Sequence, residues 1–375
     1  YSPGDYQGGN QNWMISQAPN KHIYVANNAG LLEYNGEKWK LYESPKGTIL
    51  RSVKVIESLI YTGTYMDFGY WEKDEFGNLQ YISLSDQLVE PLIEDEQFWS
   101  ILDFSDWVLF QSLDRIYVYN TKDRTFEIIE AKTNRAKIFK VGNTVYFQKI
   151  TQGIFKIENG KAVLVSDAAV FQKNVLVGAF TLGKKVVFLS ELGEFYLLED
   201  KAFSKWNLVA NDELTSLNIY SSLQLSNGNI ILGTISNGIF QIDLSGKILR
   251  SINKEHGLSN NTVLSAFEDA EQNVWLGLDN GISMINLNSP FREFKDFKGR
   301  IGDVYAAAIF QSNLYIGTNQ GLFYKPENSQ EPFKPVENTN GQVWCLNVIG
   351  DNLFCGHNNG TFSIKENRAT KISDY

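Results

Sequence analysis

The sequence of residues 230–240 is Ile-Ile-Leu-Gly-Thr-Ile-Ser-Asn-Gly-Ile-Phe: an apolar run, polar residues, an Asn-Gly pair and a second apolar run. Asn-Gly between two apolar runs is a strong signal for a tight β-hairpin. Clear copies of this phrase recur at residues 23–32, 274–282, 314–323 and 353–362, and four looser copies lie elsewhere. The chain therefore contains nine copies of one hairpin-forming repeat.

The spacing of the repeat predicts the architecture. The position of the turn glycine is occupied in order by Gly30, Gly69, Arg115, Gly153, Glu194, Gly238, Gly281, Gly321 and Gly360, at intervals of 38 to 46 residues. A period near forty with strand signals throughout is typical of β-propeller blades. Within the first repeat, turn residues separate four predicted strands at 13–17, 23–26, 31–34 and 39–42, and no helix of ordinary length is predicted anywhere. We expect an all-β propeller of four-stranded antiparallel blades.

The number of repeats suggests two domains. Seven blades are common in one ring, and the pattern changes after the seventh repeat at Asn288-Ser-Pro-Phe291, before a charged stretch at 292–300. We therefore expect residues 1–297 to form a seven-bladed propeller and 298–375 to form the first two blades of a second one. An open two-bladed piece leaves strand edges unpaired. The alternative is that all nine repeats form one ring or one open arc.

Composition limits the class of protein. The 375 residues are 43% hydrophobic and carry a net charge of −9, so the chain is a folded protein without a basic stripe for nucleic acid. We expect the basic residues between Lys132 and Lys140 to lie on solvated edges and loops. No apolar run reaches the length of a membrane span. Because Tyr1 leads directly into repeat-like sequence without an initiator Met or signal peptide, we expect the chain to be part of a longer protein.

Residues that would mark an enzyme or a metal site are not grouped in the sequence. His22, His256 and His357 belong to different repeats and have no partner at ligand spacing, so no metal and no cofactor are expected. No nucleophile elbow, phosphate loop or dinucleotide motif is present. Cys345 and Cys355 belong to neighbouring strands of one hairpin; we favour two small buried hydrophobic residues over a disulfide.

A ligand site is expected at one mouth of the propeller channel. In an antiparallel blade the start of the first strand and the end of the second lie at the same end. Aligning the repeats places Trp13, Arg51, Trp99, Tyr305 and Trp344 at this mouth, with Tyr220 close to the same register. Aromatic faces suit sugar rings, while arginine and the turn amides Asn27, Asn28, Asn237, Asn280, Asn319, Asn358 and Asn359 suit hydroxyls and carboxylates. The opposing explanation is that these aromatic residues pack between blades and the asparagines serve their own turns.

The second repeat carries an insertion beside the same mouth. Its sequence at 65–71 is Tyr-Met-Asp-Phe-Gly-Tyr-Trp, which brings Tyr65, Tyr70 and Trp71 near Asp67. The candidate ligand-binding residues are therefore Trp13, Arg51, Tyr65, Asp67, Tyr70, Trp71, Trp99, Tyr305 and Trp344. No catalytic residue is assigned.

Residues 266–285, Ala-Phe-Glu-Asp-Ala-Glu-Gln-Asn-Val-Trp-Leu-Gly-Leu-Asp-Asn-Gly-Ile-Ser-Met-Ile, resemble the repeat of two-component-regulator (Reg_prop-type) propellers. The opening Tyr1-Ser-Pro-Gly-Asp-Tyr6, with Asn12-Trp13 and residues 28–36, resembles the version that ends in a triple-tyrosine domain. The likeness covers the chain, although Arg115 and Glu194 replace the turn glycine and blades three to five lose the Trp-x-Gly-Thr pattern. The resemblance carries no ligand-binding residue with it.

The resemblance implies a function that composition does not. Such propellers form the extracytoplasmic, periplasmic sensor half of bacterial membrane regulators. They usually comprise two seven-bladed rings, a triple-tyrosine domain, one membrane helix and a cytoplasmic histidine kinase or LuxR-type helix-turn-helix output. Several members detect oligosaccharides. We therefore expect a non-catalytic sensor that binds a small polar ligand, with the rest of the receptor chain and a second copy as partners. The alternatives are a protein-docking propeller and a polysaccharide-acting enzyme.

Overall fold

The computed structural model describes residues 1–375 except 200–201, 292–295, 297–298, 328, 330 and 375. Within these residues it contains nine antiparallel sheets, eight with four strands and one with three. The described helices are short: α1 Pro3–Tyr6, α2 Ala169–Lys173, α3 Asn211–Leu214, and the 3-10 turns η1 Ser85–Gln87 and η2 Lys254–His256. The prediction of an all-β propeller is confirmed.

The first blade shows how the repeat folds. Its strands are β1 Asn12–Gln17, β2 Ile23–Asn27, β3 Gly30–Tyr34 and β4 Trp39–Glu43, in sequence order across the sheet. Each lies within one residue of its predicted range. Every side chain of β2 is buried, because this strand packs against neighbouring blades on both faces.

The chain divides into two compact units, Tyr1–Arg292 and Glu293–Tyr375, which we call the ring unit and the C-terminal unit. The boundary predicted at 297/298 lies outside the described residues. The strands of blades two to four are β5 Ser52–Ile56, β6 Leu59–Gly63, β7 Phe68–Lys73, β8 Leu79–Ser83, β9 Ser100–Phe104, β10 Trp107–Gln111, β11 Arg115–Asn120, β12 Thr125–Glu130, β13 Ile138–Val141, β14 Thr144–Lys149, β15 Gly153–Glu158 and β16 Lys161–Ser166. Those of blades five to seven are β17 Leu176–Leu182, β18 Lys185–Ser190, β19 Phe195–Glu199, β20 Ala202–Trp206, β21 Ile219–Gln224, β22 Ile230–Thr234, β23 Ile239–Ile242, β24 Ile248–Ile252, β25 Val263–Glu268, β26 Asn273–Leu278 and β27 Ile282–Asn286.

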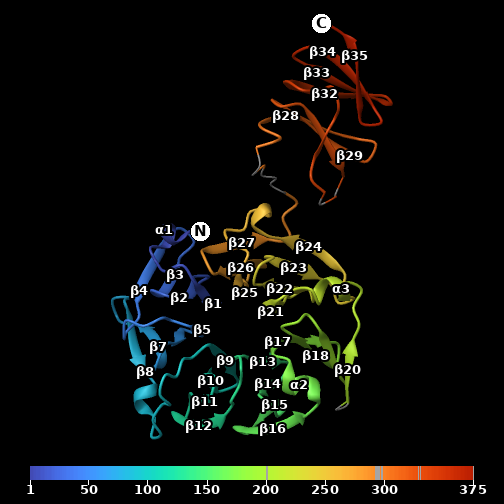
Figure 1. The fold of residues 1–375 in the computed structure, drawn as a ribbon. Helices are drawn as coiled ribbons and strands as arrows, with labels where there is room; N and C mark the ends of the chain where they lie inside the picture. The colour runs from blue at the N-terminus through green and yellow to red at the C-terminus, as the bar shows by residue number, and fades with distance from the viewer. Residues whose placement is uncertain (200–201, 292–295, 297–298, 328, 330, 375) are drawn as a thin grey trace. The chain divides into compact units, whose positions relative to one another are not determined.

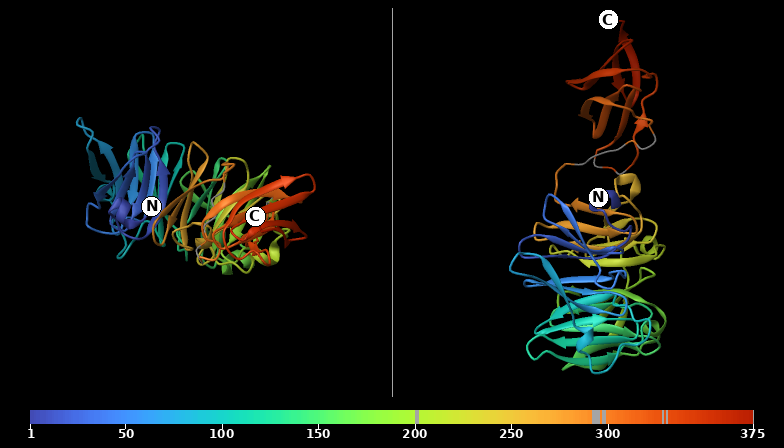
Figure 2. Two further views of the ribbon diagram at one scale, coloured as in Figure 1. Left: turned by 90° about the horizontal axis from the view of Figure 1, so that it is seen from above. Right: turned by 90° about the vertical axis from the view of Figure 1, so that its left-hand side faces the viewer.

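The seven blades of the ring unit surround a centre (Figure 1). The first strands β1, β5, β9, β13, β17, β21 and β25 contact one another in this order, and β25 also contacts β1. Figure 2 shows the same unit from two other directions, with the strands of its blades running across the thickness of the ring. Since all blades have the same order and direction of strands, the starts of the first strands meet at one end of the centre.

The first and seventh blades are joined by buried hydrogen bonds. The side-chain amide of Asn12 donates to the carbonyl of Gly281 at 2.9 Å and accepts from Asn27 at 2.8 Å. The amino group of Tyr1 donates to the carbonyl of Ile282 at 2.7 Å, and the Ile282 amide donates back at 2.9 Å. Tyr1 therefore pairs with the first residue of β27, in the blade that has three strands among the described residues.

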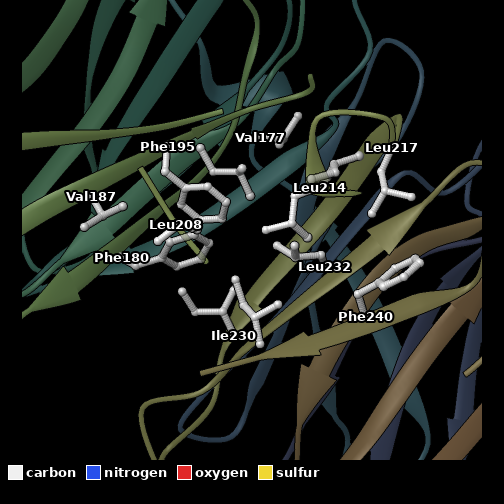
Figure 3. Close-up of a cluster of buried hydrophobic side chains, with 13 residues drawn as sticks. Val177, Phe180, Val187, Phe195, Leu208, Leu214, Leu217, Ile230, Leu232 and Phe240 are labelled. Atoms are coloured by element: carbon white, nitrogen blue, oxygen red, sulfur yellow. The ribbon is translucent and has the colours of Figure 1, made fainter. Parts of the chain in front are cut away.

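Apolar clusters between adjacent blades form the core. Figure 3 shows the cluster between blades five and six, which includes Phe180, Phe195, Leu232 and Phe240. Phe195 and Leu232 are completely buried. Similar clusters fill the other spaces between blades. The free energy that stabilises the ring is therefore spread around its circumference.

Glycine is required in some blades, but not in all, at the turn position where the third strand begins. A Cβ atom on Gly30 would lie 2.2 Å from the carbonyl oxygen of Tyr42, and one on Gly153 would lie 2.0 Å from that of Ser166. Both glycines have positive φ, at 146° and 116°. Arg115 and Glu194 do not have positive φ. Their backbone turns differently, which is why blades three and five accept side chains there and keep the repeat.

The C-terminal unit contains two four-stranded sheets. Its strands are β28 Val304–Phe310, β29 Asn313–Thr318, β30 Leu322–Pro326, β31 Lys334–Pro335, β32 Val343–Ile349, β33 Asn352–His357, β34 Gly360–Lys365 and β35 Arg368–Ser373. Both cysteines are free thiols. Cys345 is exposed and pairs with Gly356 in the sheet, so the expectation of two buried cysteines is wrong for Cys345 and correct for Cys355. Burial raises the pKa of the Cys355 thiol to about 12.

Candidate functional site: the central channel of the ring

A cavity of about 1040 Å³ occupies the centre of the ring unit. Residues in or next to the first strands of all seven blades line it. Its volume is that of a site for a small molecule. At the end where the first strands begin, it is lined by six aromatic or basic residues that we call the aromatic-basic cluster: Trp13, Arg51, Trp99, Arg135, Lys137 and Tyr220.

Arg51 lies between two indole rings. Its guanidinium carbon is 4.4 Å from the ring centroid of Trp13 and 4.2 Å from that of Trp99. The two indoles meet edge to face, with centroids 5.5 Å apart. Arg51 Nε donates to Gln97 Oε1 at 3.1 Å, and Trp13 Nε1 donates to Asn28 Oδ1 at 2.7 Å. Burial lowers the pKa of Arg51 below its usual range, although a guanidinium stays charged in proteins.

Two further cations lie against the ring of Tyr220. The guanidinium carbon of Arg135 is 4.7 Å from its centroid, and Lys137 Nζ is 5.4 Å away. Lys137 Nζ donates to the Tyr220 carbonyl at 2.7 Å. Burial, together with the Arg135 charge, lowers the pKa of Lys137 to about 7. Burial raises the pKa of Tyr220, so its phenol is neutral.

Positive charge exceeds negative charge in this cluster. No ion pair formed by a described residue involves Arg51 or Lys137, and Arg135 Nη2 has one acidic neighbour, Glu191 Oε2 at 3.4 Å. The Glu268 carboxylate, at the far end of β25, is engaged by the Ser226 hydroxyl at 2.8 Å. The cluster thus offers aromatic rings beside Arg51 and Lys137, which have no acidic partner among the described residues, and this combination suits a polar ring or an anion.

Three of the predicted site residues come together here: Trp13, Arg51 and Trp99 line the cavity. Tyr220, which the alignment placed close to the same register, lines it too. Arg135 and Lys137 were missed, and the expectation that the basic residues at 132–140 are solvated is wrong for these two. Both residues directly precede β13, the first strand of blade four, and this position in the repeat places them at the channel.

The insertion of blade two lies outside the cavity lining. Tyr65 is 37% exposed and its hydroxyl donates to Asp95 at 2.5 Å. The Asp67 carboxylate is buried and accepts from the hydroxyls of Ser83 and Ser85 at 2.8 and 2.5 Å. Tyr65 nevertheless forms a β-bridge with Gln97, the residue that holds Arg51.

Tyr70 and Trp71 of the same insertion belong to the core between blades. Trp71 is 5% exposed, and its Nε1 donates to Thr62 Oγ1 at 3.0 Å. Tyr70 packs against Tyr61 with centroids 5.7 Å apart. The turn amides Asn27, Asn28, Asn237, Asn280, Asn319, Asn358 and Asn359 do not line the cavity.

Tyr305 and Trp344 belong to the C-terminal unit. Their rings stack on each other with centroids 5.1 Å apart and planes 18° apart, and both are exposed. They occupy matching places in β28 and β32, as the alignment predicted.

Two other features are absent from the described residues. No group of three or more His, Cys, Asp and Glu side chains is placed to hold a metal ion. Within the same residues, no helix has the length and apolarity required to cross a membrane.

No protein-family model and no curated protein matches the chain. Solved structures do match. An extracellular domain described as that of a hybrid two component system, BT3049 from B. thetaiotaomicron, has a TM-score of 0.67 and 15% identity over 97% of this chain and 53% of its own. The corresponding domain of BT4673 from the same organism has a TM-score of 0.58 and 17% identity over 97% and 52%.

The fold is also shared with an enzyme. Virginiamycin B lyase from Staphylococcus aureus has a TM-score of 0.55 and 12% identity over 72% of this chain and 92% of its own. At such identities the likeness shows the fold alone. The resemblance to two-component-regulator propellers is confirmed at that level: the chain has the propeller fold of those two extracellular domains and spans about half of their length.

Proposed function

We propose that the chain is a non-catalytic, extracytoplasmic sensing module of a bacterial signal-transduction or transcription regulator, and that it binds an oligosaccharide in the channel of the ring unit. The observation that carries this proposal is the aromatic-basic cluster, in which three aromatic and three basic side chains line one end of a cavity of about 1040 Å³. Indole faces stack on the apolar faces of sugar rings, while guanidinium groups bind hydroxyls and carboxylates. The fold shared with extracellular domains of two-component systems supports a location outside the cytoplasm.

The proposal extends to the C-terminal unit. Its first strands β28 and β32 expose Val304, Tyr305, Ile309, Trp344 and Ile349. In the ring unit, by contrast, the first strands face a shared channel. We therefore propose that residues 298–375 begin a second propeller, which further blades of the receptor chain complete. That receptor would continue into a triple-tyrosine domain and a membrane helix and would act as a homodimer.

A sensor must couple ligand binding to a change in arrangement. A ligand shifts a conformational equilibrium only by its difference in affinity for the two states. The first strands of seven blades meet at the channel, so a ligand held there contacts several blades at once and favours the arrangement in which they fit it best. The altered ring would then act on the second propeller or on a second copy.

Thermal unfolding of the chain with a panel of neutral and acidic oligosaccharides tests the proposal. A ligand that binds only the native state raises the midpoint of unfolding in a saturable way. We expect one glycan class to do so, with the shift lost in Trp99→Leu and kept in Tyr65→Phe, which alters an aromatic residue outside the cavity. A cooperative transition that no saccharide moves would contradict the proposal and favour a protein-docking propeller. Turnover of the saccharide would instead show an enzyme.

A further inference from the structure

Three basic side chains from two blades converge at one end of the channel. Arg51 precedes the first strand of blade two, while Arg135 and Lys137 precede that of blade four. All three line the same cavity. Tyr220 connects them, because it contacts Arg135 and Lys137 directly and lies within electrostatic range of Arg51. Two basic side chains thus lie against the ring of Tyr220, and the third lies close enough to affect its pKa.

The hydrogen-bonding capacity of these cations is only partly used. Nη1 of Arg135 is buried and has no hydrogen-bond partner in the structure. Arg51 has its Nε bound to Gln97, which is a neutral partner. Unlike Arg135 Nη1, the Nη1 and Nη2 atoms of Arg51 keep accessible surface and form no hydrogen bond with a described residue, so they are available to a partner from outside the chain. A guanidinium has donors only, so this partner must be an acceptor.

The like charges of the cluster disfavour one another. Arg135 and Lys137 lie against the same ring of Tyr220, and the Arg135 charge helps to lower the pKa of Lys137. Placing like charges together in a partly desolvated site is unfavourable unless a counter-charge is supplied. Glu191 supplies a single carboxylate to the cluster, with its Oε2 atom 3.4 Å from Arg135 Nη2. A bound anion would complete the charge balance of the site.

We propose that this end of the channel binds the negatively charged group, a carboxylate or a sulfate, of an acidic oligosaccharide. This inference rests on the proposed function and names its ligand class. Arg51, Arg135 and Lys137 bind the anionic group by charge-assisted hydrogen bonds, which are about twice as strong as neutral ones. Trp13 and Trp99 pack against Arg51 and line the same cavity, where they would contact the sugar ring that carries the charge. The site is complete within the chain, because all seven blades that form the cavity belong to it.

Calorimetric titration with matched ligands tests the inference. The ligands are a neutral trisaccharide, a uronate trisaccharide, the methyl ester of that uronate, and a sulfated trisaccharide. We expect the uronate or the sulfated ligand to bind at least about tenfold more tightly than the ester or the neutral sugar. Binding of one and not the other identifies the acid as a carboxylate or a sulfate.

Variants show whether the cluster is responsible. Arg135→Gln should weaken binding of the acidic ligand by about tenfold or more and leave the ester unchanged. Arg124→Gln, at an exposed arginine in the turn between β11 and β12, is the matched control and should have no effect. If Arg135→Gln does not fold, Arg51→Gln gives the same test from another blade.

The outcomes separate the two proposals. Equal affinity for acid and ester, unchanged by Arg135→Gln and Arg51→Gln, would overturn the anionic-ligand inference and leave a sensor of neutral glycans. Binding of none of the four ligands would overturn both proposals.

Discussion

The ammonium group of Lys137 in blade four donates a hydrogen bond of 2.7 Å to the main-chain carbonyl of Tyr220 in blade six. Blade five lies between these two blades in the ring, so the bond crosses the channel between non-neighbouring blades. It holds the Lys137 amino group at the end of the cavity where the aromatic-basic cluster lies. The charge state of Lys137 therefore links the stability of the ring to the properties of the proposed site.

The pKa of Lys137 predicts a pH dependence of stability. Its value of about 7 in the folded chain lies below the usual lysine value of about 10.4 expected in the unfolded chain. Between these values the unfolded chain binds a proton that the folded chain does not, so this residue makes the free energy of unfolding rise with pH. Below the folded pKa both states bind the proton and the contribution is constant.

Lys137→Met removes this contribution. Urea unfolding at about pH 6.5 and about pH 9.5 should show that the wild type gains stability relative to the variant at the higher pH. Lys161→Met, at an exposed lysine that begins β16, serves as control and should show a constant difference from the wild type. The same constant difference for Lys137→Met would refute the low pKa.

Closure of the ring depends on Asn12. Its buried amide bonds Gly281 of blade seven and Asn27 of blade one. Asn12→Ala should lower the free energy of unfolding by about 1–3 kcal/mol, because it leaves buried partners without hydrogen bonds. In Asn288→Ala the lost bond, to Gln272, is exposed, and we expect little change. If both variants lost the same free energy of unfolding in chemical denaturation, the Asn12 contact between blades one and seven would not stabilise the ring.

The turn glycines provide a test of the blade register. Gly30→Ala places a Cβ atom 2.2 Å from the Tyr42 carbonyl oxygen, whereas Gly36→Ala faces open space; both residues have positive φ. Gly36→Ala should cost about 1 kcal/mol from backbone strain alone. Gly30→Ala should cost clearly more in urea unfolding, because the third and fourth strands must move apart. Similar costs would mean that these two strands are not packed as described.

The fold was predictable because its signals are local. The Asn-Gly turn at 237–238 and the continuous apolar run of β22 both appear in the chain as written, and the structure confirms them. Blades three and five keep four paired strands although Arg115 and Glu194 replace the turn glycine. What the sequence could not give is the φ angle at these positions, which determines whether a Cβ atom fits.

The candidate site was predictable in part. Trp13, Arg51 and Trp99 were found because they share one register at the start of the first strand. Arg135 and Lys137 were missed because a cluster of basic residues has the composition of a solvated loop, and only the closed ring turns it toward the channel. Trp71 shows the opposite case. It was predicted to lie at the channel mouth, but its side chain packs into the core between blades, and the sequence does not show which way that side chain points.

Oxidative footprinting by hydroxyl radicals, read by mass spectrometry, tests most directly whether the channel is the ligand site. The chain is labelled with and without the oligosaccharide that raises its unfolding midpoint most. Trp13, Met14 and Trp99, which line the cavity, should become protected, while the exposed residues Tyr65, Tyr305 and Trp344 should react as before. Protection of Tyr65, Tyr305 or Trp344 with none at Trp13 and Trp99 would contradict the account.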